Sequence, residues 1–181
     1  MTLDPSEKPL GRKFFDRNAE AVARDLIGCY LVRKRGRKLL KSRISETEAY
    51  VGPHDLACHA SRGRTLRTEA MFGPAGTLYV YLVYGLHWMI NVVTGPVDFP
   101  AAVLIRGVDS IVGPGRLSKA LGVTGALNGH PASERSGLWF AKDHRLAALP
   151  ILRTPRIGVG YAGPIWSNKK YRFVALPKSP E

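Results

Sequence analysis

Short runs of apolar, β-branched and aromatic residues recur along this chain between Gly-, Pro- and polar-rich turns, and the run at 39–50 alternates with the two-residue period of a β-strand. This pattern predicts strands at 29–34, 39–50, 78–83, 88–93, 101–106, 138–140, 156–159 and 172–176. Apolar positions three and four apart predict an amphipathic helix at 19–27 that stops at Gly28. A second helix is predicted at 114–121, ending at Gly122.

The order of these elements predicts an α+β fold in one domain spanning residues 1–181. Because the strands arrive as consecutive hairpins, we expect a curved, mostly antiparallel β-sheet with surrounding helices and a protruding β-hairpin. Residues 1–10 are expected to be flexible. The Gly-, Asn-, Ser- and Pro-rich segment 123–137 is predicted to be an extended connection without an assigned role.

The predicted hairpin at 78–93 is rich in aromatic residues. Tyr79 and Tyr81 fall on one strand face, whereas Tyr84 falls at the bend beside Gly85, so the three rings cannot all fill one core. An exposed ring at a hairpin tip is suited to insertion between stacked bases, and rings on the adjoining strand are suited to stacking on a flipped base. The alternative is a hairpin that folds back with its tip buried.

The charge balance indicates a polyanionic partner. Lys and Arg number 27 against 14 Asp and Glu, a formal net charge of +13, and much of this charge lies in short arginine-rich stretches. Nucleic acid is the first hypothesis, but charge alone does not separate DNA from RNA or from an acidic membrane. For a single stretch such as 33–37, around Gly36, a merely solvated basic surface is the alternative.

Several classes of protein are excluded by composition. Two cysteines are too few for a disulfide scaffold or a four-thiolate zinc site, and no other metal-ligand spacing occurs, so no metal is predicted. The N-terminus lacks a basic stretch followed by an apolar one, so no secretory signal is predicted and an intracellular location is expected. The longest mostly apolar run, at 78–93, is too short for a membrane-spanning helix.

Candidate chemistry lies near the end of the strand at 39–50. Its alternation places Ile44, Glu46, Glu48 and Tyr50 on one face, just before a Gly-Pro break. This is a suitable position for an acid or a base, although two such glutamates can equally pair with arginines on a solvated face. His59, in a short predicted helical turn at 56–59, has either a structural or a catalytic role.

Longer motifs are more specific. The block at 43–53 reads RISETEAYVGP; Asp55, His59, the blocks at 71–72 and 76–85, and Asn91 follow in order. Later blocks lie at 104–106, 113–117, 120–121 and 156–163. From about residue 10 to 174 the chain closely resembles the alkyladenine (3-methyladenine) DNA glycosylase family.

The resemblance implies a monofunctional DNA glycosylase that initiates base excision repair. Such an enzyme flips an alkylated or deaminated purine, of the 3-methyladenine, hypoxanthine or ethenoadenine kind, out of double-stranded DNA and cleaves its N-glycosidic bond by water attack at C1′. By position, Glu48 would be the general base, and Glu46 would have a supporting or structural role. No cofactor or metal is implied, and a monomer is expected.

The same matching assigns the base pocket. Tyr50 and Tyr81 would sandwich the damaged purine, and His59 would supply a polar contact to it. Asn91 would crowd the exocyclic amine of a normal guanine and so disfavour it.

DNA contacts are implied at three further positions. Tyr84 would be the wedge that fills the vacated space in the base stack, Leu86 would contact DNA beside it, and Arg106 would lie near the extruded nucleotide's backbone. The loop at 60–70 departs from the family pattern by about one residue, so its arginines are left unassigned.

Two other classes stay open at this stage. A non-catalytic nucleic-acid-binding module, for example an RNA-associated one, would use the same basic surface and aromatic hairpin. An acidic-membrane binder is less favoured, because no basic amphipathic helix of adequate length is visible. The spacing does not determine which damaged purine is preferred or whether an acid assists a neutral leaving group.

Overall fold

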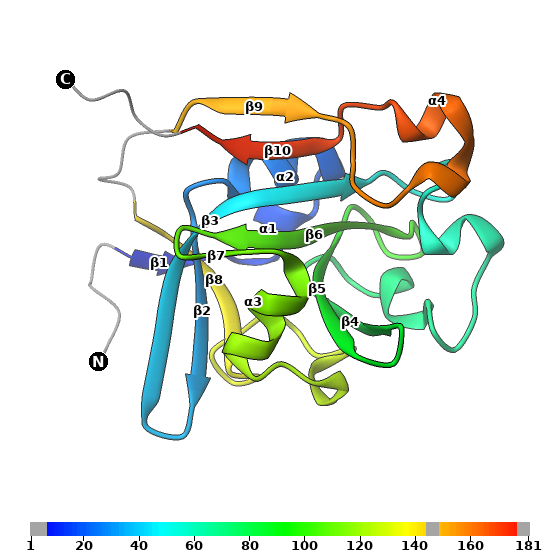
Figure 1. The fold of residues 1–181 in the computed structure, drawn as a ribbon. Helices are drawn as coiled ribbons and strands as arrows, with labels where there is room; N and C mark the ends of the chain where they lie inside the picture. The colour runs from blue at the N-terminus through cyan, green and yellow to red at the C-terminus, as the bar shows by residue number, and fades with distance from the viewer. Residues whose placement is uncertain (1–6, 144–148, 177–181) are drawn as a thin grey trace.

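The computed structural model describes residues 7–143 and 149–176, and it confirms the predicted α+β class (Figure 1). Within these residues ten strands form one curled sheet, and all their pairings are antiparallel. The main path runs β1-β8-β2-β3-β6-β5-β4; β10 joins β3 to β9, and β7 pairs with β6. The strands are β1 (Glu7–Pro9), β2 (Tyr30–Arg35), β3 (Lys38–Tyr50), β4 (Leu78–Val83), β5 (His87–Thr94), β6 (Ala101–Val108), β7 (Ile111–Val112), β8 (Leu138–Asp143), β9 (Ile151–Thr154) and β10 (Arg172–Ala175).

The helices are short and lie around this sheet. They are α1 (Arg12–Phe15), α2 (Ala19–Leu26), α3 (Pro114–Leu121) and α4 (Gly163–Ser167), with 3-10 turns at His59–Arg62, Glu69–Phe72, Gly125–Leu127 and Gly160–Ala162. In the view of Figure 1, α2 lies behind the sheet, and α3 lies in front between the hairpins β2–β3 and β4–β5. The two helices predicted at 19–27 and 114–121 are therefore confirmed as α2 and α3.

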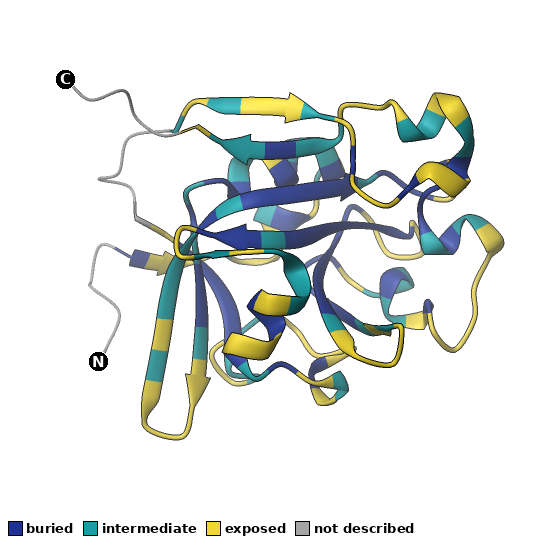
Figure 2. Ribbon diagram, in the orientation of Figure 1, coloured by how far each residue is buried: buried dark blue, intermediate teal, exposed yellow. Residues whose placement is uncertain are grey.

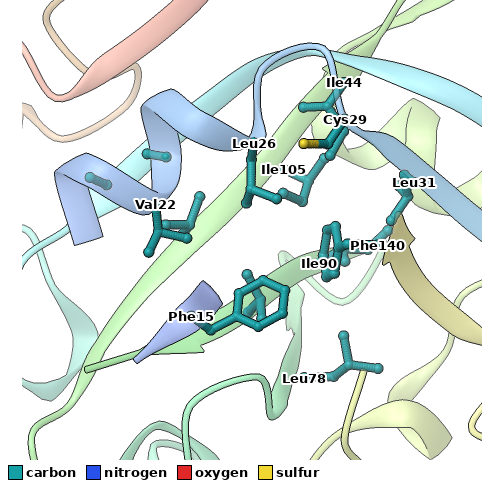
Figure 3. Close-up of a cluster of buried hydrophobic side chains, with 14 of the residues drawn as sticks. Phe15, Val22, Leu26, Cys29, Leu31, Ile44, Leu78, Ile90, Ile105 and Phe140 are labelled. Carbon is teal, nitrogen blue, oxygen red and sulfur yellow. The ribbon is translucent and has the colours of Figure 1, made fainter. Parts of the chain in front are cut away.

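The main core lies where α2 packs on the sheet. Asn18 caps the helix by accepting from the N–H of Glu20 at 2.8 Å, and Val22 and Leu26 lie on its buried face. Figure 3 shows these side chains among Ile105 and other apolar residues of the cluster. Each such fully buried aliphatic side chain contributes roughly 1.5–3 kcal/mol to stability. The sheet beneath is correspondingly dark in Figure 2, while both hairpin tips are exposed.

A β-bulge divides strand β3. The pairing with β6 shifts register between Ile44 and Glu46 and again before Thr47. Ile44 is buried in the apolar core (Figure 3), whereas Glu46 and Glu48 contact Arg106. The expectation that Ile44 shares a face with the two glutamates is therefore wrong, because the extra residue breaks the simple alternation.

Two other expectations are corrected. The segment 156–159 is not a strand: the side chain of Arg156 is buried in an ion pair and Gly158 has φ 75°, and β9, which precedes it, pairs with β10 instead. Of the stretch 1–10 expected to be flexible, residues 7–9 form β1 and pair with β8, while 1–6 lie outside the described residues.

Smaller differences concern the loops. The predicted helical turn at 56–59 begins later, as the 3-10 turn His59–Arg62. Segment 123–137 contains a 3-10 turn, and a Cβ on Gly125 would stand 2.7 Å from the ring of Trp88, so this connection is packed against β5. Across 7–143 and 149–176, no helix has the length and apolar character needed to cross a membrane.

Candidate active site

A fully buried carboxylate, Glu48, lies near the end of strand β3. Its Oε1 accepts a hydrogen bond from the backbone N–H of Ile157 at 2.8 Å, and its Oε2 accepts one from the Tyr50 hydroxyl at 3.0 Å. The guanidinium of Arg106, on the neighbouring strand β6, lies 3.5 Å from Oε2. Glu48 is thus held by three groups from three separate segments.

Glu46 lies one step back along the same face. Its Oε1 accepts from Nε of Arg106 at 2.8 Å and from Nε of Arg172 at 2.6 Å. Arg106 therefore bridges the two glutamates. The alternative interpretation is therefore correct in pairing the glutamates with arginines but wrong in placing them on a solvated face, because both are buried.

Burial has an electrostatic consequence for Glu48. Loss of solvation raises the pKa of its carboxyl, and the charge of Arg106 and the hydrogen bond from Ile157 partly oppose that rise. Burial, followed by the charge of Glu48, also raises the pKa of Tyr50 well above its usual value, so the tyrosine stays a hydrogen-bond donor. The result is a carboxylate with an increased affinity for a proton.

A cavity of about 470 Å³ lies beside this carboxylate, lined by the three residues that contact it, Tyr50, Arg106 and Ile157. Its wall includes six residues predicted from the sequence to contact the base or DNA: Tyr50, His59, Tyr81, Tyr84, Asn91 and Arg106. Glu48 lies behind the wall, bonded to Tyr50 and Ile157, which both line it. The volume of the cavity falls in the range typical of small-molecule binding sites.

Aromatic rings form one side of the cavity. Nδ1 of His59 and the Tyr79 hydroxyl are 3.0 Å apart and share a hydrogen bond, and the His59 and Tyr81 ring centroids are 4.6 Å apart at 71°. Burial, then the charges of Arg67 and Arg62, lower the pKa of His59 to about 4. At neutral pH the imidazole is therefore uncharged.

Asn91 is fixed beside these rings. Its Nδ2 donates to the Tyr79 carbonyl at 3.0 Å, and only 3 % of the residue is exposed. Tyr79 and Asn91 are directly opposite each other in the β4–β5 pairing, so the side-chain amide of Asn91 bonds to the backbone of the adjacent strand. Its position at the cavity wall is therefore rigid.

The tip of hairpin β4–β5 projects into solvent. Tyr84 is 91 % exposed and adopts φ 52°, Gly85 has φ 68°, and the N–H of Leu86 donates to the Val83 carbonyl at 3.0 Å. A left-handed conformation is costly for a bulky residue and is often found at functional positions. Leu86 is 75 % exposed, and it does not line the cavity. The alternative of a buried tip is wrong.

Sequence reasoning missed a buried ion pair behind the site. Arg156 binds Asp55 through two parallel contacts of 2.5 and 2.9 Å, and both side chains are fully buried. Arg156 also donates to the Ala49 carbonyl at 2.9 Å, and its guanidinium lies 4.8 Å from the ring centroid of Tyr50. The pair joins the end of β3 to the loop that supplies the Ile157 N–H.

No spacing signal identifies this pair, because Asp55 and Arg156 are 101 positions apart. Each lies in a motif block, but nothing in the blocks indicates contact. Within the described ranges, no group of three or more His, Cys, Asp or Glu side chains is arranged to hold a metal ion.

Comparison with known proteins agrees with the geometry. The family model described as methylpurine-DNA glycosylase (MPG) matches residues 13–112 and 108–179. A Myxococcus xanthus protein named "Putative 3-methyladenine DNA glycosylase" is 47% identical over 178 residues, covering 91% of this chain and 88% of the relative. Proteins with the same name from Legionella pneumophila (strain Corby) and Carboxydothermus hydrogenoformans are 43% and 42% identical, covering 92% and 91% of this chain and 93% of each relative.

These matches extend over nearly the whole chain, and they confirm the resemblance inferred from the motifs. They also decide between the open classes in favour of an enzyme. The chain belongs to the methylpurine-DNA glycosylase family and is a DNA glycosylase, a hydrolase of N-glycosyl bonds in DNA.

Proposed function

We propose that this enzyme flips damaged purine nucleotides out of duplex DNA and excises the base by water attack at C1′, with Glu48 as the general base. Substrates of the proposal are 3-methyladenine-type purines, hypoxanthine and ethenoadenine. One observation carries the proposal: a buried carboxylate of raised pKa lies behind the wall of an aromatic cavity. The abasic product would then enter base excision repair.

The exposed hairpin tip supports the flipping step. Tyr84 is almost free of protein contacts, while its backbone is held by the turn, so its ring can enter the base stack without unfolding anything. Leu86 presents a second exposed apolar side chain at the same hairpin tip. Filling the vacated space offsets part of the unstacking cost, which is a few kcal/mol per base.

Ring stacking supports recognition of an alkylated base. Tyr50 and Tyr81 line the cavity, and aromatic faces attract the positive charge that an N3- or N7-alkylated purine carries. A neutral His59 adds no repelling charge, and it supplies a polar ring nitrogen. In the proposal, the rigid Asn91 occupies the space that a guanine amine would need.

In the proposed chemical step, the two carboxylate oxygens of Glu48 have different roles because they have different hydrogen-bond partners. Oε1 accepts from a backbone N–H at 2.8 Å, whereas the contacts of Oε2 are longer, 3.0 Å to the Tyr50 hydroxyl and 3.5 Å to Arg106. We assign Oε2 to the water. As the C1′–N bond breaks and its electron pair leaves with the base, the water oxygen bonds to C1′ and its proton passes to Glu48.

Arg106 supports this step from the side. Its guanidinium contacts both Glu46 and Glu48, so in the proposal it orients the Glu48 carboxylate. The resemblance also implies that Arg106 lies near the backbone of the extruded nucleotide. The negative charge of Glu48 also stabilises the oxocarbenium-like sugar.

The test is single-turnover base release from duplexes with one central hypoxanthine or ethenoadenine, and from methylated DNA. Wild type should yield abasic product, and Glu48→Gln should lose at least about 10²–10⁴-fold in rate, the usual contribution of a general base. Its DNA affinity should be unchanged or tighter, since the substitution removes a negative charge. Glu134→Gln, an exposed glutamate changed in the same way, is the matched control and should keep the wild-type rate.

Three results would contradict parts of this proposal. Binding without release from any substrate would overturn the excision of these purines. Release by Glu48→Gln at the wild-type rate would remove Glu48 from the general-base role. Release from only one of the three substrates would restrict the substrate range and leave the mechanism intact.

A further inference from the structure

The β2–β3 hairpin is a second projecting element, and the mechanism does not use it. It is a ladder of six residue pairs from Tyr30 with Arg43 to Arg35 with Lys38, closed by a two-residue turn in which Gly36 has φ 57°. Figure 1 shows it extending from the body of the sheet, and its outer part is exposed in Figure 2. It is therefore built as a stable arm and not as a flexible loop.

The end of this arm carries cations and no acids. Lys34, Arg35, Arg37 and Lys38 are all exposed, and none forms an ion pair with any residue of the described ranges. We call these four residues the basic tip. Four like charges at one turn repel one another, and an anionic ligand would relieve that repulsion.

Helix α3 connects the basic tip to the active site. At its C-terminal end, Arg33 donates to the Leu121 carbonyl at 3.2 Å, and the Arg35 guanidinium lies against Gly122 so closely that a Cβ there would stand 2.3 Å from it. At its N-terminal end, Pro114 lines the cavity. Eight helical residues span about 12 Å, so the basic tip lies about one short helix away from the cavity.

Exposed cations continue along α3 itself. Arg116 and Lys119 are exposed, and neither has an acidic partner in the described part of the chain. With the basic tip they extend positive charge away from the cavity along α3 and the β2–β3 hairpin. One turn of B-DNA spans about 34–36 Å, so phosphates within a single turn of a nucleotide in the cavity come within reach of this strip.

We propose that the basic tip binds the phosphate backbone of the DNA duplex on one side of the flipped nucleotide. The inference rests on the proposed base flipping from duplex DNA, because it places the basic tip relative to a nucleotide in the cavity. Interactions of this kind carry no sequence information, and they supply salt-dependent affinity to damaged and undamaged duplex alike.

The test compares two triple variants of equal net charge. Lys34→Gln, Arg37→Gln and Lys38→Gln remove charge from the basic tip but leave Arg35 packed on α3. Lys8→Gln, Arg12→Gln and Lys13→Gln remove three exposed cations of β1 and α1 as the matched control. Circular dichroism and thermal melting check that both variants fold.

Undamaged and hypoxanthine-containing duplexes are titrated at several salt concentrations. The slope of log Kd against log salt should fall by up to about 3 for the tip variant, near one for each phosphate that is no longer neutralised, and by less than about 1 for the control. Base release at saturating enzyme should match wild type in both variants, since the cavity is untouched.

Duplex length tests the one-sided placement. Shortening the duplex arm on one side of the lesion should weaken wild-type binding more than shortening the other, and the tip variant should not show this asymmetry. Equal slopes for tip variant and control, or a wild-type response symmetric in arm length, would overturn the inference. Failure of the proposed function appears differently, as absence of base release by wild type under any condition.

Discussion

Two buried carboxylates only seven residues apart, Glu48 and Asp55, are treated very differently by the fold. Asp55 receives a two-point contact from Arg156 and accepts from the backbone N–H groups of Val51 and Ala57 at 3.2 and 3.0 Å. Glu48 receives one backbone N–H, one tyrosine hydroxyl and an arginine at 3.5 Å that it shares with Glu46.

The difference indicates which carboxylate is structural and which is poised for chemistry. A fully bonded, charge-matched carboxylate has no capacity left for a substrate, and its removal leaves an unpaired buried cation. A carboxylate with fewer and weaker partners has a raised pKa, and it can exchange one of them for water. Asp55 and Arg156 therefore act as positioning residues, because they hold the strand and the loop that present Glu48.

Among substitutions of these carboxylates, the largest expected effect is on the stability of the protein. Asp55→Asn should lower the free energy of unfolding by about 3–5 kcal/mol, since it leaves Arg156 buried without its counter-charge. Urea denaturation measures the decrease. Asp25→Asn, which weakens partly exposed ion pairs with Arg17 and Arg24, is the control and should cost less than about 1 kcal/mol. A decrease for Asp55→Asn as small as that control would show that the buried pair is not structural.

An intermediate effect is expected at Glu46. Glu48 must be ionised to act as base, so the rate of base release should rise with pH through its raised pKa. Because the charge of Glu46 helps to raise the pKa of Glu48, Glu46→Gln should shift the acidic limb of the pH–rate profile to lower pH. Single-turnover rates from pH 4 upward measure it.

The corresponding control changes a distant glutamate. Glu20→Gln, whose partner is Arg153, should leave the acidic limb in place. A purely structural role for Glu46 would lower the rate equally at every pH, and that outcome would contradict the electrostatic coupling of the two glutamates.

The smallest effect is expected for the stability of Glu48→Gln. The folded-state pKa of Glu48 is raised, so above that pKa the ionised carboxylate costs folding free energy, and this cost disappears as pH falls and the group is protonated. Glutamine carries no such cost at neutral pH, and its amide oxygen can still accept from Ile157. The free energy of unfolding at pH 7 should therefore be unchanged or higher by less than about 1 kcal/mol. A decrease near that of Asp55→Asn would contradict the distinction between the two carboxylates.

Much of the fold was predictable because local patterns were strong. β-rich runs on either side of a glycine-containing turn identified both hairpins. The predicted helix end at Gly122 was correct because that residue adopts the left-handed φ 56° typical of a helix C-terminus. The prediction of a strand at 156–159 was wrong for a physical reason. The apolar pattern of this segment resembles a strand, but its backbone and side chains are used by Glu48 and Asp55, two residues far away in the chain.

The active site, too, was predictable from the sequence in some respects and not in others. Motif resemblance named the residues, and alternation brought Glu46, Glu48 and Tyr50 to one face. The bulge that removes Ile44 from that face was not visible in the pattern, because it depends on register with β6. The roles of the individual residues stay predictions until the variants are measured.

By itself, the sequence determined both predicted helices, most of the strands, the fold class and the net charge of +13, because these follow from composition or from short-range pattern. The family followed from the resemblance of its ordered motif blocks. Only the tertiary structure decided which charges are buried together. It gave Asp55 a complete set of partners and Glu48 an incomplete one, and it placed the basic tip one helix away from the cavity. These properties depend on pairing between segments as much as 109 residues apart, and desolvation and pairing energies exist only once those segments meet.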